Sequence, residues 1–80
     1  MLIQYIQTAM RRAHYELLED GTIVGTINGL QGVLANAPTL EECREELQEV
    51  LEEWIVVGLR LGMVIPDVGG VTLMHELEVA

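Results

Sequence analysis

Apolar and polar residues recur with the period of an α-helix over residues 39–61. The apolar positions that fall on one side at helical spacing are Cys43, Leu47, Val50, Leu51, Trp54, Ile55 and Leu61. The opposite face carries Glu41, Glu42, Glu45, Glu49, Glu52 and Glu53. This spacing predicts one long amphipathic helix with a buried stripe and an acidic surface.

Both ends of this helix carry sequence signals. Thr39 follows Pro38 and can cap the free N–H groups of the first turn, while Glu42 can reach back to the Thr39 N–H in a capping box. Gly62 can adopt the left-handed conformation that ends many helices. We therefore expect the helix to begin at Thr39 and to end beside Gly62.

Residues 12–37 alternate with the period of β-strands and predict a three-stranded meander. The segment Glu19-Asp20-Gly21-Thr22 predicts a hairpin turn, because Asp-Gly accommodates positive φ. Residues 28–32 contain two glycines but no phosphate-binding motif, which predicts a simple loop. One face of the first strand is expected to carry Ala13, Tyr15 and Leu17, and one face of the second to carry Ile23, Gly25 and Ile27.

The two ends of the chain add one element each. Residues 1–11 place Leu2, Ile3, Ile6, Ala9 and Met10 near helical spacing, which predicts a short helix with a strand as the alternative. Residues 71–79 alternate and predict a fourth strand, which can lie parallel to a neighbour because the long helix is a crossover. We therefore expect residues 1–80 to form a single two-layer α+β domain, with the long helix across one face of the sheet.

Beyond Glu53 the long helix loses its acidic face. Residues 54–61 are apolar nearly all round, and Arg60 is their only charge. A helix without a polar face is normally covered on both sides. The sheet covers one side, and either the N-terminal helix or a second copy of the chain covers the other. We predict a homo-oligomer around Val56, Val57 and Leu59.

The net charge is −9 and the four basic residues are all arginine. So few cations cannot neutralise a phosphate backbone, which argues against direct nucleic-acid binding. The acidity suits a basic protein partner, with candidate contacts at Glu45, Glu49, Glu52 and Glu53. The alternative is that it only keeps a small apolar domain soluble. No signal peptide or membrane-spanning run is recognisable, so we expect a cytoplasmic chain that is not bound to membranes.

Catalytic groups are sparse and scattered. His14 and His75 fall on different predicted strands and on faces that disagree, and no Cys or His pair has metal-ligand spacing. Serine is absent, and Cys43 lies on the apolar helix face, where a small buried hydrophobe is expected. We expect no catalytic, metal or cofactor site; a metal-binding protein using His14 or His75 is the alternative.

Five short segments between residues 15 and 66 occur in an order and at spacings that resemble the HicB family of antitoxins. They are Glu19-Asp20-Gly21, the loop segment 27–33 (INGLQGV), Thr39-Leu40-Glu41-Glu42-Cys43, Leu51-Glu52-Glu53-Trp54 and Gly62-Met63-Val64-Ile65-Pro66. The resemblance implies a partial RNase-H-like βββαβ fold that lacks the catalytic carboxylates of a nuclease.

The resemblance also implies a role, because HicB-type antitoxins bind and neutralise HicA, a small basic RNA-cleaving toxin. Many members of the family carry a further DNA-binding domain. Only residues 67–80 follow the Ile-Pro segment here, so we expect no such domain in this chain. The alternative implied by stand-alone members is an oligomeric structural or adaptor module without a toxin partner.

Overall fold

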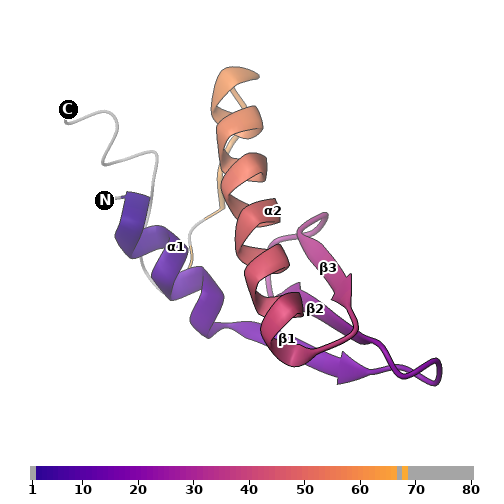
Figure 1. Ribbon diagram of the computed structural model, residues 1–80. Coiled ribbons are helices and arrows are strands. Elements are labelled where there is room, and N and C mark those ends of the chain that lie inside the picture. Colours follow the sequence, from indigo (N-terminus) through magenta and orange to yellow (C-terminus); the bar gives the residue numbers. More distant parts are fainter. Residues whose placement is uncertain (1, 67, 69–80) are drawn as a thin grey trace.

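The computed structural model describes residues 2–66 and 68. Its elements follow in the order α1 (Leu2–Arg11), β1 (Ala13–Leu17), β2 (Ile23–Ile27), β3 (Leu34–Ala37) and α2 (Leu40–Arg60). The strands form an antiparallel sheet in the order β1-β2-β3, and α2 lies across one face of it (Figure 1). The predicted α+β class is confirmed. The strand predicted at 71–79 lies outside the described residues.

The register of the sheet brings small residues together under α2. Tyr15 of β1 pairs with Gly25 of β2, which pairs in turn with Ala35 of β3. A Cβ atom on Gly25 would lie 3.0 Å from the Tyr15 ring and 3.1 Å from Cys43 Sγ of α2. Gly25 therefore allows the helix and the Tyr15 ring to approach β2 closely.

The predicted hairpin turn joins β1 to β2. Gly21 has φ +86°, its N–H donates to Leu18 O at 3.0 Å, and the Leu18 N–H donates to Thr22 O at 2.8 Å. Asp20 Oδ1 accepts hydrogen bonds from the hydroxyl and the N–H of Thr22 at 2.6 and 2.9 Å. These bonds stabilise the carboxylate and lower the pKa of Asp20.

Two consecutive tight turns connect β2 to β3. The Leu30 N–H donates to Ile27 O, and the Val33 N–H donates to Leu30 O. The glycines at positions 29 and 32 each have φ near +90° at the third residue of their turn, the geometry of type II turns. The loop predicted at 28–32 is thus a rigid double turn that tucks Leu30 into the core.

The caps of α2 follow the sequence signals. The Glu42 N–H donates to Thr39 Oγ1 at 3.1 Å, while the reciprocal bond of a full capping box is not formed among the described residues. At the other end Gly62 has φ +69°. Its N–H donates to Leu59 O, and the Met63 N–H donates to Gly58 O, the paired bonds of a Schellman motif.

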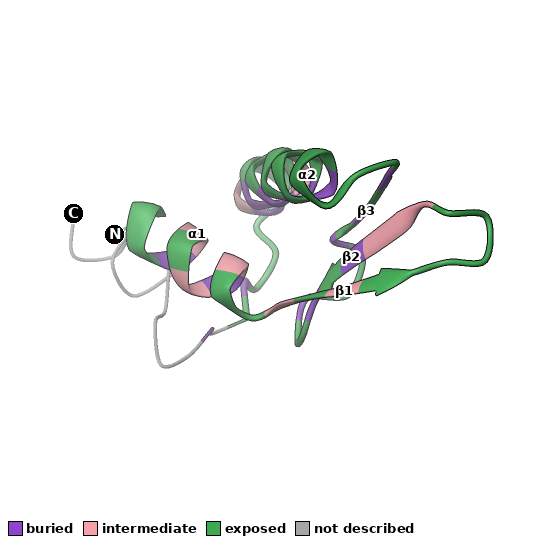
Figure 2. Cartoon of the chain, turned by 60° about the horizontal axis from the view of Figure 1, so that its bottom comes forward, coloured by how far each residue is buried: buried purple, intermediate pink, exposed green. Residues whose placement is uncertain are grey.

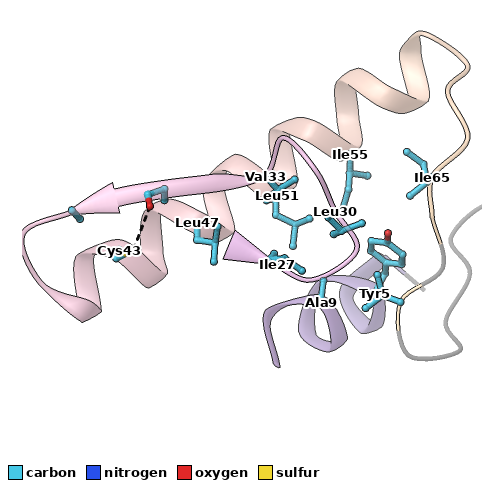
Figure 3. Packing of buried hydrophobic residues seen from close by; sticks show 13 residues of the cluster. Tyr5, Ala9, Ile27, Leu30, Val33, Cys43, Leu47, Leu51, Ile55 and Ile65 are labelled. Carbon is cyan, nitrogen blue, oxygen red and sulfur yellow. Dashed lines mark hydrogen bonds between the residues drawn. The ribbon is translucent and has the colours of Figure 1, made fainter. Parts of the chain in front are cut away.

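The core lies between α2, the sheet and α1 (Figure 3). Its fully buried side chains from α2 are Cys43, Leu47, Leu51 and Ile55. Tyr5 of α1 is also fully buried, and its hydroxyl donates to Pro66 O at 2.6 Å. This bond fastens α1 to the segment that follows α2, so the two ends of the described chain close over the core.

Four predicted apolar positions lie in solvent instead. Leu2 and Ile3 are exposed because α1 turns Tyr5 and Ala9 inward. Leu17 is 73% exposed because β1 extends past α2 at the hairpin end. Leu61 is 70% exposed, since the C-terminal half of α2 projects beyond the described strands (Figure 1). The spacing of these residues fits the helix or strand that contains them, but the packing contacts of that element end before it reaches them.

Candidate functional site

The exposed face of α2 carries the candidate partner contacts. Glu45, Glu49, Glu52 and Glu53, the acidic ridge, occupy positions i, i+4, i+7 and i+8 of one helix and are all exposed. Figure 2, which views α2 nearly along its axis, shows the side of the helix that faces away from the sheet in the exposed colour. Within residues 2–66 and 68, none of the four makes an ion pair. The structure therefore brings the predicted residues together on one surface.

The acidic ridge is electrostatically unfavourable in the isolated chain. Glutamates four residues apart face one another, and like charges at this spacing destabilise a helix by about 0.2–0.5 kcal/mol per pair. Glu45 with Glu49 and Glu49 with Glu53 are such pairs. A cationic partner would relieve this repulsion, so the ridge favours basic partners over acidic ones.

A second surface, which the sequence did not indicate, is an uncharged groove on another side of α2 from the acidic ridge. Its volume is about 810 Å³, and no charged side chain lines it. The double turn at 28–32 and the adjoining ends of β2 and β3 line it, together with Trp54, Met63, Val64 and Pro66. Trp54 is half-buried, so its ring contributes both to the core and to this groove. The pair of glycines was the available signal, because each permits the turns that shape the groove.

The predicted oligomer residues divide between two directions. Val56 and Val57 are 47% and 53% exposed. Leu59 is half-buried and packs against the core. Leu59 therefore lies away from the face that the two valines share, because its side chain contacts the buried cluster.

The candidate chemical groups lie apart. His14 is exposed on β1, and His75 lies outside the described residues. No cluster of three potential metal ligands occurs in residues 2–66 and 68. Cys43 is fully buried, and its thiol donates to Ala35 O at 3.7 Å (Figure 3). Burial, with a smaller contribution from the charge of Glu46, raises the pKa of the Cys43 thiol.

A polar groove separates the two helices. Its walls are Ile6, Gln7, Met10 and Arg11 of α1 and Arg44 and Gln48 of α2. Burial raises the pKa of Tyr15, and the positive charge of Arg44 partly opposes that shift. Arg44 thus lies near the end of the sheet that α1 leads into.

These features define a small α+β protein with exposed acidic and apolar surfaces on one long helix. A family model described as UPF0150-like matches residues 4–66, and the chain belongs to this family. The match contains residues 15–66, the whole of the region that resembles HicB. No described helix has the length and apolar character needed to cross a membrane.

A solved relative has the same fold. The crystal structure of TTHA0281 from Thermus thermophilus superposes with a TM-score of 0.85 at 40% sequence identity. The similarity covers 90% of this chain and 90% of that chain. No curated protein matches the sequence.

Proposed function

We propose that this chain is a HicB-like antitoxin that binds and neutralises a small basic HicA-type RNA-cleaving toxin through protein–protein contact. The observation that carries the proposal is the acidic ridge, whose four exposed carboxylates lack ion-pair partners in the described part of the chain. Membership of the UPF0150-like family supports the proposal, because the family model matches the same part of the chain that resembles HicB.

The acidic ridge and the groove would contribute to binding in different ways. Exposed charges steer a basic partner and raise the association rate, but each contributes little affinity. The groove lined by Trp54 offers apolar area, and aromatic side chains in such positions commonly dominate interface energies. The ridge would therefore attract the toxin, and the groove would hold it.

The proposal requires no chemistry from this chain. Inhibition by contact needs only a surface that covers the toxin's RNA-binding or catalytic face. We accordingly propose that the chain is not an enzyme and works without metal or cofactor in the cytoplasm, without binding nucleic acid or membranes.

The test is co-expression with the product of an adjacent reading frame that encodes a small basic protein. We expect co-purification, rescue of growth and loss of toxin RNase activity on mixing. Glu49→Arg should slow association roughly tenfold or more at low salt. Glu16→Arg makes the same charge change on the outer face of β1 and should leave the rate nearly unchanged. A toxin that remains fully active in the presence of excess antitoxin would refute the proposal.

The alternative is an oligomeric adaptor of the same fold without a toxin. The exposed Val56 and Val57 favour this possibility, since two adjacent half-exposed valines on a helix suit self-association. Co-purification with a basic protein encoded by an adjacent reading frame favours the antitoxin, and the absence of any such protein favours the adaptor.

A further inference from the structure

Five residues of α2 line up on a face that nothing in the described chain covers. Their spacing of i, i+4, i+7, i+8 and i+11, counted from position 49, places them on one side of the helix. They are Glu49, Glu53, Val56, Val57 and Arg60, and all five are exposed. The sheet and α1 pack on the other sides of α2, through residues such as Leu51 and Ile55.

The charges on this face have a definite order. Glu53 precedes the two valines by about one turn, and Arg60 follows them by about one turn. The two charged residues are seven positions apart, about 10 Å along the axis, and they form no ion pair with each other. Arg60 is also the only charge among residues 54–66. An apolar centre is therefore flanked by a negative charge on one side and a positive charge on the other.

We propose that this face joins two copies of the chain through antiparallel α2 helices, with the two-fold axis between Val56 and Val57. In this register Val56 lies opposite Val57 of the second copy. Arg60 lies opposite Glu53 of the second copy, and the two-fold axis repeats the pair. The dimer thus buries four valines and forms two intermolecular ion pairs.

Other arrangements of the same helices bring like charges together. A parallel pair places Arg60 against Arg60 and Glu53 against Glu53. If the two-fold axis of an antiparallel pair is moved one turn toward the N-terminus, it passes beside Glu53, and the two Glu53 carboxylates face each other. A shift toward the C-terminus opposes the two Arg60 side chains. Because like charges facing each other are unfavourable, charge order selects the proposed register.

The net charge of the chain supports the same location. Two copies that each carry −9 repel one another, and most of α2 up to Glu53 is densely acidic. Residues 54–66 contain no carboxylate, so copies can approach here at the least electrostatic cost. The C-terminal half of α2 also projects clear of the described strands, which leaves room for a second helix (Figure 1).

This dimer does not require a toxin. It uses Glu53, one of the four residues of the acidic ridge, and leaves Glu45, Glu49 and Glu52 for a basic partner. Contact over about two helical turns is small. Interfaces below about 1,200 Å² are usually weak, so we expect a dissociation constant in the micromolar range.

The experiment is sedimentation equilibrium of the full chain over about 1–500 µM, the range that brackets a micromolar dimer. The wild type should shift from 8.9 kDa to twice that mass. Arg60→Glu and Glu53→Arg each convert two attractive contacts into repulsive ones, and each should raise the dissociation constant about tenfold or more. The double variant Glu53→Arg/Arg60→Glu restores both pairs and should dimerise like the wild type.

The swapped variant has the same composition and net charge as the wild type, so general repulsion cannot explain its recovery. Glu45→Arg is the matched control, because it makes the same charge change two turns before Glu53. It should leave the dimer intact. Far-UV circular dichroism should be unchanged in every variant, since all the substituted side chains are exposed. A wild-type monomer throughout the range, dimerisation unaffected by the single reversals, or no recovery in the swap overturns the proposal.

Discussion

The substitution Gly25→Ala tests the close packing of β2 against the Tyr15 ring and α2. A Cβ atom there would lie 3.0 and 3.2 Å from two carbons of the Tyr15 ring and 3.1 Å from Cys43 Sγ. These distances are shorter than ordinary van der Waals contact, so the ring and the thiol must both shift. The backbone of Gly25 is not in a left-handed conformation, so the effect arises from packing alone.

The expected loss in the free energy of unfolding is about 1–3 kcal/mol, the usual cost of adding a methyl group to a filled core. Reduced flexibility of the unfolded chain offsets part of it, by about 0.4–1 kcal/mol. Urea unfolding at one fixed protein concentration measures the difference. Thr26→Ala, on the solvent side of the same strand, should change stability by less than about 0.5 kcal/mol.

A double-mutant cycle with Cys43→Ala identifies the cause. Removing Sγ clears one of the two obstructions, so Gly25→Ala should cost less in the Cys43→Ala background than in the wild type. The expected coupling energy is about 0.5 kcal/mol or more, the range typical of residues in contact. Strict additivity, or a Gly25→Ala variant as stable as the wild type, would show that the close approach of α2 to β2 does not limit stability.

Three further predictions concern stability. Thr39→Ala removes the N-cap hydrogen bond and should lower the free energy of unfolding by about 1 kcal/mol, while Thr39→Ser should not; urea unfolding compares them. Because the pKa values of Cys43 and Tyr15 are raised on folding, the unfolded chain releases these protons first; their contribution to stability should be constant below about pH 8 and fall as the pH rises above about 9. Cys43→Ala should flatten the fall, and an unchanged slope would contradict this assignment. Gly58→Ala places a Cβ 2.8 Å from Ile65 Cδ1, so its helix-propensity gain of about 1 kcal/mol should be larger in an Ile65→Val background than in the wild type; thermal unfolding of both single variants and the double variant measures the difference.

The acidic ridge and the valine face share α2 but differ in what they can bind. The ridge presents charge without apolar area, so it acts over distance on a basic protein. The valine face presents a short apolar centre with one charge of each sign, so it suits a surface with the same pattern reversed, which a second copy supplies. One helix can therefore serve two contacts because its charge density falls after Glu53.

The local elements of this protein were readable from the sequence alone. The start and the end of α2 follow from Thr39 and Gly62, and the hairpin follows from Asp20-Gly21. The predicted positions of α1 and the three strands agree with the structure to within one or two residues. The acidic ridge was equally predictable, since residues within two turns of one helix have fixed relative directions.

Long-range packing decided the rest. Helical spacing placed Leu61 with the buried stripe and Leu59 with the outer surface. In the structure, Leu61 is exposed because α2 extends past the sheet at that position, whereas Leu59 packs against the core. Likewise, only the tertiary structure shows that the Tyr5 hydroxyl donates a hydrogen bond to Pro66 O, sixty-one residues away, and that Trp54 lines a groove. Helical periodicity sets which residues share a face, because that depends on neighbours in the chain. Which face is covered, and for how many turns, depends on where distant segments come to lie.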